Sequence, residues 1–435
     1  MNAATSRGEE MHALIRELYP ICRSITGDGV RETLRILQRS LPLEIHEVPS
    51  GTRVFDWTVP REWNLRGAWI ATRDGRRVID AKDHNLHVMS YSTPVRGRFS
   101  RAELREHLHS LPDRPDWIPY RTSYYTEAWG FCVTQKQLDA LTEPEYEVCI
   151  DSTLAPGHLS YGECLLPGRS DREVLISVHV CHPSLCNDNL SGIAVAARLA
   201  AELHGHEREY GVRFVFVPGT IGSLTWLSRN REGLSRVAHG LTLVCVGDAS
   251  PFTYKRTLAG AAEVDRVAAL VLRESGAPHQ LIDFFPFGYD ERQYNSPGFR
   301  LPVGSLMRAR HGRFPEYHTS ADDPSFVSPQ RLEESLTVVQ AMLEVLEANR
   351  TYRNTSPYGE PQLGARGIYR AMGGEPDLGD LQLAMLWLLQ LSDGTRSLLD
   401  VAERSGMRFD LVRRAAALLG EHGLLAPASA TPTAR

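Results

Sequence analysis

The chain has 435 residues, with 48 Lys and Arg against 53 Asp and Glu, which gives a formal net charge of −5 at pH 7. This balance excludes a surface built mainly for nucleic acids or anionic membranes, and no apolar stretch approaches the roughly 20 residues of a membrane span. Seven irregularly spaced cysteines indicate reduced thiols. The polar start lacks the hydrophobic region of a secretory signal, so we expect a cytoplasmic protein.

Three regions follow one another in the predicted secondary structure. Residues 1–53 begin with helical periodicity, and residues 147–350 alternate strands with helices, which predicts one α/β domain with a mainly parallel sheet covered on both faces. Between them, residues 54–146 contain short aromatic strands and many turns. We therefore expect a small α+β domain inserted into the α/β domain.

The C-terminal residues 365–427 predict three helices joined by Gly-containing turns, with a wing after Gly423, which is a winged-helix pattern. The presumed recognition helix, residues 409–419, has only Arg413 and Arg414 as cations. Because phosphate contacts need a stronger basic face, we do not expect a nucleic acid as the main partner. A protein contact is the alternative, and the sequence leaves open whether the chain forms a homo-oligomer.

The segment from Val174 to Leu199 carries the strongest chemical signal. An apolar strand, residues 174–178, is followed by His179 and His182, and a helical pattern begins just after Asp188. Imidazole and carboxylate are ligands that zinc prefers, and ligands at a strand end lie at the carboxyl edge of the sheet. The alternative is a hydrogen-bonded histidine and a helix-capping aspartate.

Three further groups are candidates for the same site. Asp248 follows an apolar strand and is either a ligand or a turn residue. The loop from Phe287 to Arg308 contains Asp290 and Glu291, which could equally be a solvated charge cluster. The run from Phe314 to Asp323 contains His318, which we predict to be a metal ligand.

With these residues in place, the chain resembles the co-catalytic zinc aminopeptidases. His179, the Asn187–Gly192 run, Asp248 and Tyr317–Thr319 stand in that family's order. ICRSITGDGVRETL, HVCHPSLCNDNLSG, PGTIGS, DERQYNSPG and PEYHTSAD are more closely similar to an aminopeptidase-like family often encoded near polysaccharide or natural-product biosynthesis genes. The resemblance implies a three-layer, zinc-exopeptidase-like domain with an inserted domain and a winged helix, binding one or two zinc ions.

The chain departs from the aminopeptidase pattern at two points. Pro218-Gly219-Thr220-Ile221 stands where that family has a Glu-Glu pair, one as general base and one as ligand. Cys181 stands where an aspartate is expected, and His182 is an extra candidate ligand nearby. The usual base and one ligand of a second metal are therefore missing.

Two interpretations follow. In the first, zinc is held by His179 or His182 together with Asp188, Asp248 and His318, and Glu291 or Asp290 is the general base of a hydrolase. Such an enzyme would cleave an amide bond in a small peptide-like or aminoacylated substrate beneath the inserted domain. In the second, the protein binds a metal or metabolite without hydrolysis and acts as a winged-helix regulator or scaffold. The candidates for substrate binding are Arg292, Tyr294, Glu316 and Tyr317.

Overall fold

The computed structural model describes residues 6–368 and 376–428. They form two compact units, one made of residues up to 265 with 277–339 and the other of residues 266–276 with 340 onward. Within the described ranges, none of the helices combines the length and the apolar character that crossing a membrane requires.

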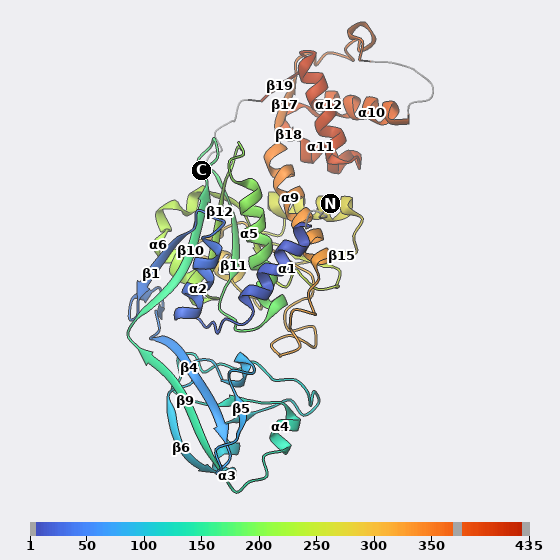
Figure 1. The fold of residues 1–435 in the computed structure, drawn as a ribbon. Helices are drawn as coiled ribbons and strands as arrows, with labels where there is room; N and C mark the ends of the chain where they lie inside the picture. The colour runs from blue at the N-terminus through green and yellow to red at the C-terminus, as the bar shows by residue number, and fades with distance from the viewer. Residues whose placement is uncertain (1–5, 369–375, 429–435) are drawn as a thin grey trace. The chain divides into compact units, whose positions relative to one another are not determined.

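The first unit is built on an eight-stranded sheet (Figure 1). Its four central strands run parallel, whereas β1 and β10 at one edge and β14 next to β16 pair antiparallel. The expected sheet was mainly parallel, and the observed sheet is mixed. The chain leaves this sheet after β1 for the inserted region and returns along β10, so these two strands run in opposite directions. The strand order is β1 (Glu44–Pro49), β10 (His158–Leu166), β12 (Gly211–Val217), β11 (Glu173–His179), β13 (Val237–Leu243), β16 (Val303–Met307), β14 (Phe252–Lys255) and β15 (His279–Ile282).

Helices α5 (Ser191–Leu203) and α6 (Ile221–Arg229) connect the central strands. From β11 the chain passes through α5 to β12 on one side, then through α6 to β13 on the other side of β11. Because such crossovers are right-handed, this reversal places α5 and α6 on opposite faces of the sheet, as Figure 1 shows. The reversal also opens a crevice at the carboxyl end of β11, where α/β folds keep their ligand sites. Other helices of this unit are α1 (Arg7–Leu18), which packs on α5, and α2 (Asp28–Leu37), which packs on β10.

The inserted region forms a four-stranded antiparallel sheet. Its two long strands, β4 and β9, pair with each other, and β9 continues to Ala155, beyond the boundary expected at residue 146. The sheet order is β5 (Arg77–Asp80), β4 (Glu62–Ala71), β9 (Glu145–Ala155) and β6 (Val95–Ser100), with the short helices α3 (Arg101–Arg105) and α4 (Gln135–Asp139) and two short strand pairs, β2 (Arg53–Val54) with β3 (Trp57–Thr58) and β7 (Leu108–His109) with β8 (Phe131–Cys132).

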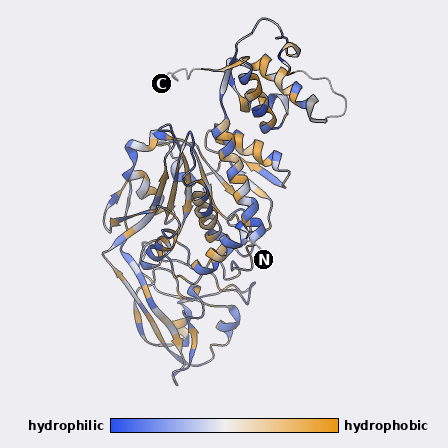
Figure 2. Ribbon diagram, turned by 45° about the horizontal axis from the view of Figure 1, so that its top comes forward, coloured by the Kyte–Doolittle hydropathy of each residue, from blue (hydrophilic) through white to orange (hydrophobic). Residues whose placement is uncertain are grey.

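The inserted sheet and the main sheet share one hydrophobic core. A single buried cluster contains Ile70 and Val148 of the inserted strands together with Val215 and Trp226 of the main domain. Figure 2 shows hydrophobic stretches along the central strands, in keeping with strands buried on both faces. The inserted region is therefore packed on the main domain as part of one body.

The second unit contains a three-stranded sheet and three helices, in agreement with the predicted winged helix. Its first strand, β17, begins at Thr351 and lies between the other two strands, so this unit starts earlier than the expected residue 365. Its elements are β17 (Thr351–Asn354), α10 (Pro376–Leu391), β18 (Asp393–Ser397), α11 (Leu398–Ser405), α12 (Phe409–Glu421) and β19 (Leu425–Pro427); α7 (Glu263–Ser275) and α9 (Pro329–Ala348) contribute residues to both units.

Candidate metal centre and adjoining pocket

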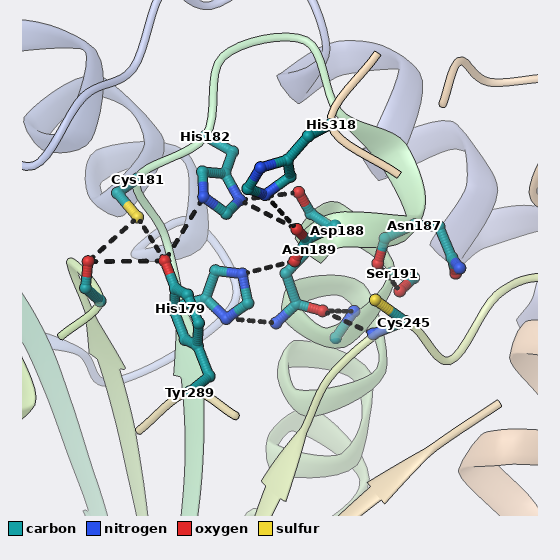
Figure 3. Close-up of polar contacts among 12 residues, drawn as sticks. His179, Cys181, His182, Asn187, Asp188, Asn189, Ser191, Cys245, Tyr289 and His318 are labelled. Carbon is teal, nitrogen blue, oxygen red and sulfur yellow. Dashed lines mark hydrogen bonds and ion pairs between the residues drawn. The ribbon is translucent and has the colours of Figure 1, made fainter. Parts of the chain in front are cut away.

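The turn between β11 and α5 holds its own side chains in fixed hydrogen bonds (Figure 3). Asn187 donates from Nδ2 to Asp248 at 2.8 Å and accepts from the N–H of Gly247, while Asn189 donates to the carbonyl of Leu243. The hydroxyl of Ser191 donates to the carbonyl of Asn187 at 2.7 Å. These bonds tie the turn to the end of β13 and leave the carboxylate of Asp188 free to face elsewhere.

Three histidines surround the carboxylate of Asp188. Nε2 of His179 lies 2.8 Å from Oδ1, Nε2 of His318 lies 3.0 Å from Oδ2, and Nδ1 of His182 lies 3.5 Å from Oδ2. The ligand atoms of His179, His182 and Asp188 are within 4.8 Å of one another, and all three residues are buried. The sequence marked these four as candidate ligands, with His179 and His182 as alternatives, and the structure brings all four together.

The protonation of this cluster favours a cation. Burial lowers the pKa of His182 to about 3, so its ring is neutral at pH 7. Burial opposes the ionisation of Asp188, yet the neighbouring His182 and His179 and hydrogen bonds from His179 and His318 hold its pKa well below the usual range. A neutral imidazole beside an ionised carboxylate is the protonation state in which these groups bind a metal.

His318 reaches the cluster from a loop that pairs with the inserted region. The carbonyl of His318 accepts a hydrogen bond from the N–H of Tyr120 at 2.8 Å, and Pro119 forms a β-bridge with Thr319. The ring of Tyr317 stacks on that of His318 with centroids 3.9 Å apart. His318 has a φ of 57°, a left-handed conformation that non-glycine residues adopt at a cost, so this pairing and stacking hold its ring in place.

Asp322, which was not predicted as a site residue, binds the backbone of the turn that carries Asp188. Its carboxylate accepts from the N–H groups of Asn187 at 2.6 Å and Asp188 at 3.0 Å. Burial raises its pKa to about 8. Its presence in the SADD run after His318 was the available signal, but a sequence does not show which backbone groups a side chain will meet.

Asp248, a predicted ligand, does not join the cluster. Both oxygens are used in the turn: Oδ2 accepts from Asn187 and from the N–H of Ala309, and Oδ1 accepts from the N–H of Ser250. The structure thus places Asp248 where it positions Asn187, with its lone pairs directed to N–H groups.

The two candidate bases in the loop before α8 (Glu291–Tyr294) differ in their surroundings. Glu291 forms a buried ion pair with Lys255 at 2.5 Å, with both side chains 1% exposed, and also accepts from the N–H of Tyr289. Asp290 accepts from the hydroxyl of Ser223 at 2.7 Å, and burial raises its pKa to about 7 against the opposing influence of His179. Glu291 is therefore held as a structural ion pair, and Asp290 remains as the carboxyl beside the cluster.

The predicted substrate-binding residues also separate. Arg292 lines the pocket that lies next to His182 and His318. Tyr294 is fully buried and its hydroxyl lies 2.8 Å from that of Ser177, so a substrate does not reach it. Glu316 and Tyr317 do not line this pocket, and Tyr317 acts by stacking on His318.

Tyr289 is the main residue that sequence reasoning missed. Its ring lies 4.0 Å from that of His179 between centroids, and its hydroxyl is 3.4 Å from Nε2 of His182 and from Sγ of Cys181. A Cβ added to Gly219 would lie 1.9 Å from the Tyr289 ring. The phenol therefore occupies the space that a side chain after β12 would need, and the glycine in PGTIGS was the only local signal.

A pocket of about 440 Å³ opens above the cluster, which suits a small molecule. His182, His318 and Tyr289 contribute to its wall, and α6 contributes Ile221 and Leu224. Residues 120–122 and 124–125 of the inserted region also line it. The candidate ligands therefore border a cavity large enough for a substrate.

Comparison with known proteins places these features in a family. Residues 12–349 match the model of a domain of unknown function, DUF4910, and residues 350–427 match a winged helix-turn-helix model. A relative from Clostridium acetobutylicum, named for polysaccharide biosynthesis and an aminopeptidase-like domain, is 50% identical over 413 residues, which is 95% of each chain.

Solved structures agree with this assignment. A crystal structure of a presumed peptidase from C. acetobutylicum has a TM-score of 0.92 at 48% identity and covers 97% of this chain and 96% of its own. The zinc aminopeptidase BSAP from Bacillus subtilis has a TM-score of 0.56 at 15% identity and covers 79% of this chain and 96% of its own, a likeness of fold. The chain thus belongs to the DUF4910 family, with a mixed α/β fold similar to that of zinc aminopeptidases and a C-terminal winged helix.

Proposed function

We propose that the protein is a zinc-dependent hydrolase that cleaves an amide bond in a small peptide-like or aminoacyl substrate. One observation carries this proposal: three histidines converge on the buried carboxylate of Asp188 beside a pocket of substrate size. The aminopeptidase-like fold supports the same reaction class, although fold does not fix function.

The residues present fit a zinc ion. Imidazole nitrogens and a carboxylate oxygen are ligands that zinc prefers, and the ligand atoms of His179, His182 and Asp188 lie within 4.8 Å of one another, close enough to bind one ion. His179, His182, Asp188 and His318 would hold the ion. Zinc bound there would supply Lewis acidity to polarise an amide carbonyl.

Asp290 is the better candidate for the general base. A base works best when its pKa lies near the working pH, and burial brings the pKa of Asp290 to about 7. The Ser223 hydroxyl orients the carboxyl by donating to Oδ1. Glu291, by contrast, is neutralised by Lys255. We therefore assign proton transfer to Asp290.

A role as a DNA-binding regulator has weaker support. Of the two cations predicted on the recognition helix, Arg413 forms an ion pair with Asp410 of the same helix at 2.6 Å. Its charge is thus partly neutralised before any phosphate approaches. We assign the chemistry of the protein to the first unit.

The test is the metal content, by mass spectrometry, of protein purified without chelators or an affinity metal. We expect close to stoichiometric zinc in the wild type and loss of zinc in Asp188→Asn and in His318→Ala. The exposed His279→Ala is the matched control and should retain zinc. Wild-type protein that stays free of zinc after reconstitution would contradict the proposal.

The same preparations test the base. Asp290→Asn should keep its zinc and lower kcat on a hydrolysed amide by about 10²–10⁴-fold, the usual contribution of a general base. Glu291→Gln, once corrected for its folded fraction, should retain most of kcat. The opposite ranking of these two variants would assign the base to Glu291.

A further inference from the structure

The pocket beside the cluster has no acidic side chain in its lining. Its described lining residues include two arginines, Arg121 and Arg292, and neither aspartate nor glutamate. A substrate with a free ammonium end needs a carboxylate partner when it leaves water. Asp188, the buried carboxylate of the cluster, is already surrounded by histidines. The lining therefore offers cations but no anion.

Neither arginine forms an ion pair within the described part of the chain, although Arg292 acts on the buried Asp290, whose pKa burial raises and the guanidinium lowers. Among residues 6–368 and 376–428, neither guanidinium makes an ion pair or a side-chain hydrogen bond, and both side chains are exposed. Other surface arginines of the domain do form ion pairs, as Arg66 does with Asp151 and Arg61 with Glu127. A guanidinium presents a planar fork of N–H donors that matches a carboxylate or phosphate.

Two aromatic side chains in the lining of the same pocket are exposed to solvent. Trp57 is 47% exposed and Tyr125 is 50% exposed, and their ring centroids lie 5.3 Å apart. Tyr120 and Tyr124 continue this wall toward the cluster, with their hydroxyls 2.8 Å apart. Exposed aromatic faces beside cations suit the apolar or ring portion of an anionic ligand.

From these features we infer that the pocket selects a substrate with an anionic group, a carboxylate or a phosphate, attached to an apolar or ring-bearing body, and disfavours one with a free ammonium end. This inference rests on the proposed function, because it narrows the peptide-like substrates of that hydrolase. Arg121 and Arg292 bind the anion, and Trp57 with Tyr125 covers the body. Both arginines act on substrate affinity.

Equilibrium binding by titration calorimetry tests the inference without turnover. The probes are N-acetylphenylalanine, its neutral amide, and phenylalanine amide with a free ammonium group, with phenyl phosphate as the phosphate probe. We expect an anionic probe to bind about tenfold or more tightly than the neutral amide, and the ammonium probe to bind most weakly, because the guanidinium groups repel it. The tighter of the two anionic probes identifies carboxylate or phosphate as the preferred group.

Matched variants locate the effect. Arg121→Met and Arg292→Met should each weaken anion binding by about tenfold and leave the neutral probe unchanged. Arg105→Met, an exposed arginine of α3 outside the pocket, is the control and should change neither. Equal or tighter binding of the ammonium probe, no binding of either anion at millimolar concentration, or unchanged affinity in both variants would overturn the inference.

The two proposals fail in distinguishable ways. Asp188→Asn should lose zinc but keep the ranking of anionic over ammonium probes, because Arg121 and Arg292 are intact. Zinc in the wild type without that ranking would leave the hydrolase proposal in place and remove the substrate class. The ranking without zinc would keep the anion site and remove the hydrolase.

Discussion

Two acidic loops reach the same end of the sheet and use their carboxylates in opposite ways. In the turn before α5, the side chains around Asp188 hydrogen-bond to the backbone, and Asp188 is left to the histidines. In the loop before α8, Glu291 is itself taken by Lys255. A carboxylate near the site is therefore available to a ligand only where neighbouring side chains make the hydrogen bonds and ion pairs that hold the loop.

The largest expected effect comes from breaking the buried ion pair between Lys255 and Glu291. Glu291→Gln leaves Lys255 charged and buried without its counterion, so we expect a loss of about 3–5 kcal/mol in the free energy of unfolding. Urea denaturation at pH 7 measures this change. Replacing both partners, as in Lys255→Met with Glu291→Leu, should recover much of it, and zinc content should not change. A loss below 1 kcal/mol would show that the pair is not a structural anchor.

The next largest effect comes from removing hydrogen bonds in the turn before α5. Asn187→Ala removes two buried hydrogen bonds, and we expect a loss of about 2–3 kcal/mol in stability and a zinc affinity lowered about 10–100-fold, as for other partners that orient a ligand. Zinc competition with a chromogenic chelator and urea denaturation give the two values. Asn295→Ala, which also removes buried hydrogen bonds, is the control: it should lose similar stability and keep its zinc affinity.

The smallest effect has the opposite sign and depends on pH. Burial raises the pKa of Asp290 from 3.8 to about 7, so the folded state binds more protons than the unfolded state between these values, and stability falls as pH rises through that window. Asp290→Asn removes the cost of ionisation, so with zinc removed from both proteins the variant should be more stable than wild type at pH 8. The gain should shrink toward pH 4. Thermal unfolding across this range checks the trend, and a pH-independent difference would contradict it.

The parts that could be predicted from the sequence are those that local pattern determines. The strand ending at His179, the turn holding Asp188 and the loop carrying His318 were predicted from residue type and spacing, and the structure brings them together. The edges of the sheet were not, since strand direction there depends on where the inserted region leaves and returns. The winged helix was predicted, but its first strand, β17, was not, because residues 351–354 show no clear alternation of apolar and polar side chains.

The residues that escaped prediction have partners far away in the chain. Lys255 forms its ion pair with Glu291, which is 36 residues away in the sequence. Tyr289 fills the space beside Gly219, which is 70 residues away. Asp248 stands at a strand end, as a ligand would, yet three N–H donors take its oxygens. A sequence gives the chemistry of each side chain, but it does not show which of several possible partners the side chain binds in the folded protein.

The hydrophobic core shared by the inserted sheet and the main domain limits how the protein can diversify. Removing the inserted strands would take Ile70 and Val148 out of this shared core, so this region cannot be exchanged as an independent module. New substrates must instead be acquired by single replacements in the loops that face the cavity, above all residues 120–125. Relatives with different substrates should then keep the strands of the insertion and vary its loops.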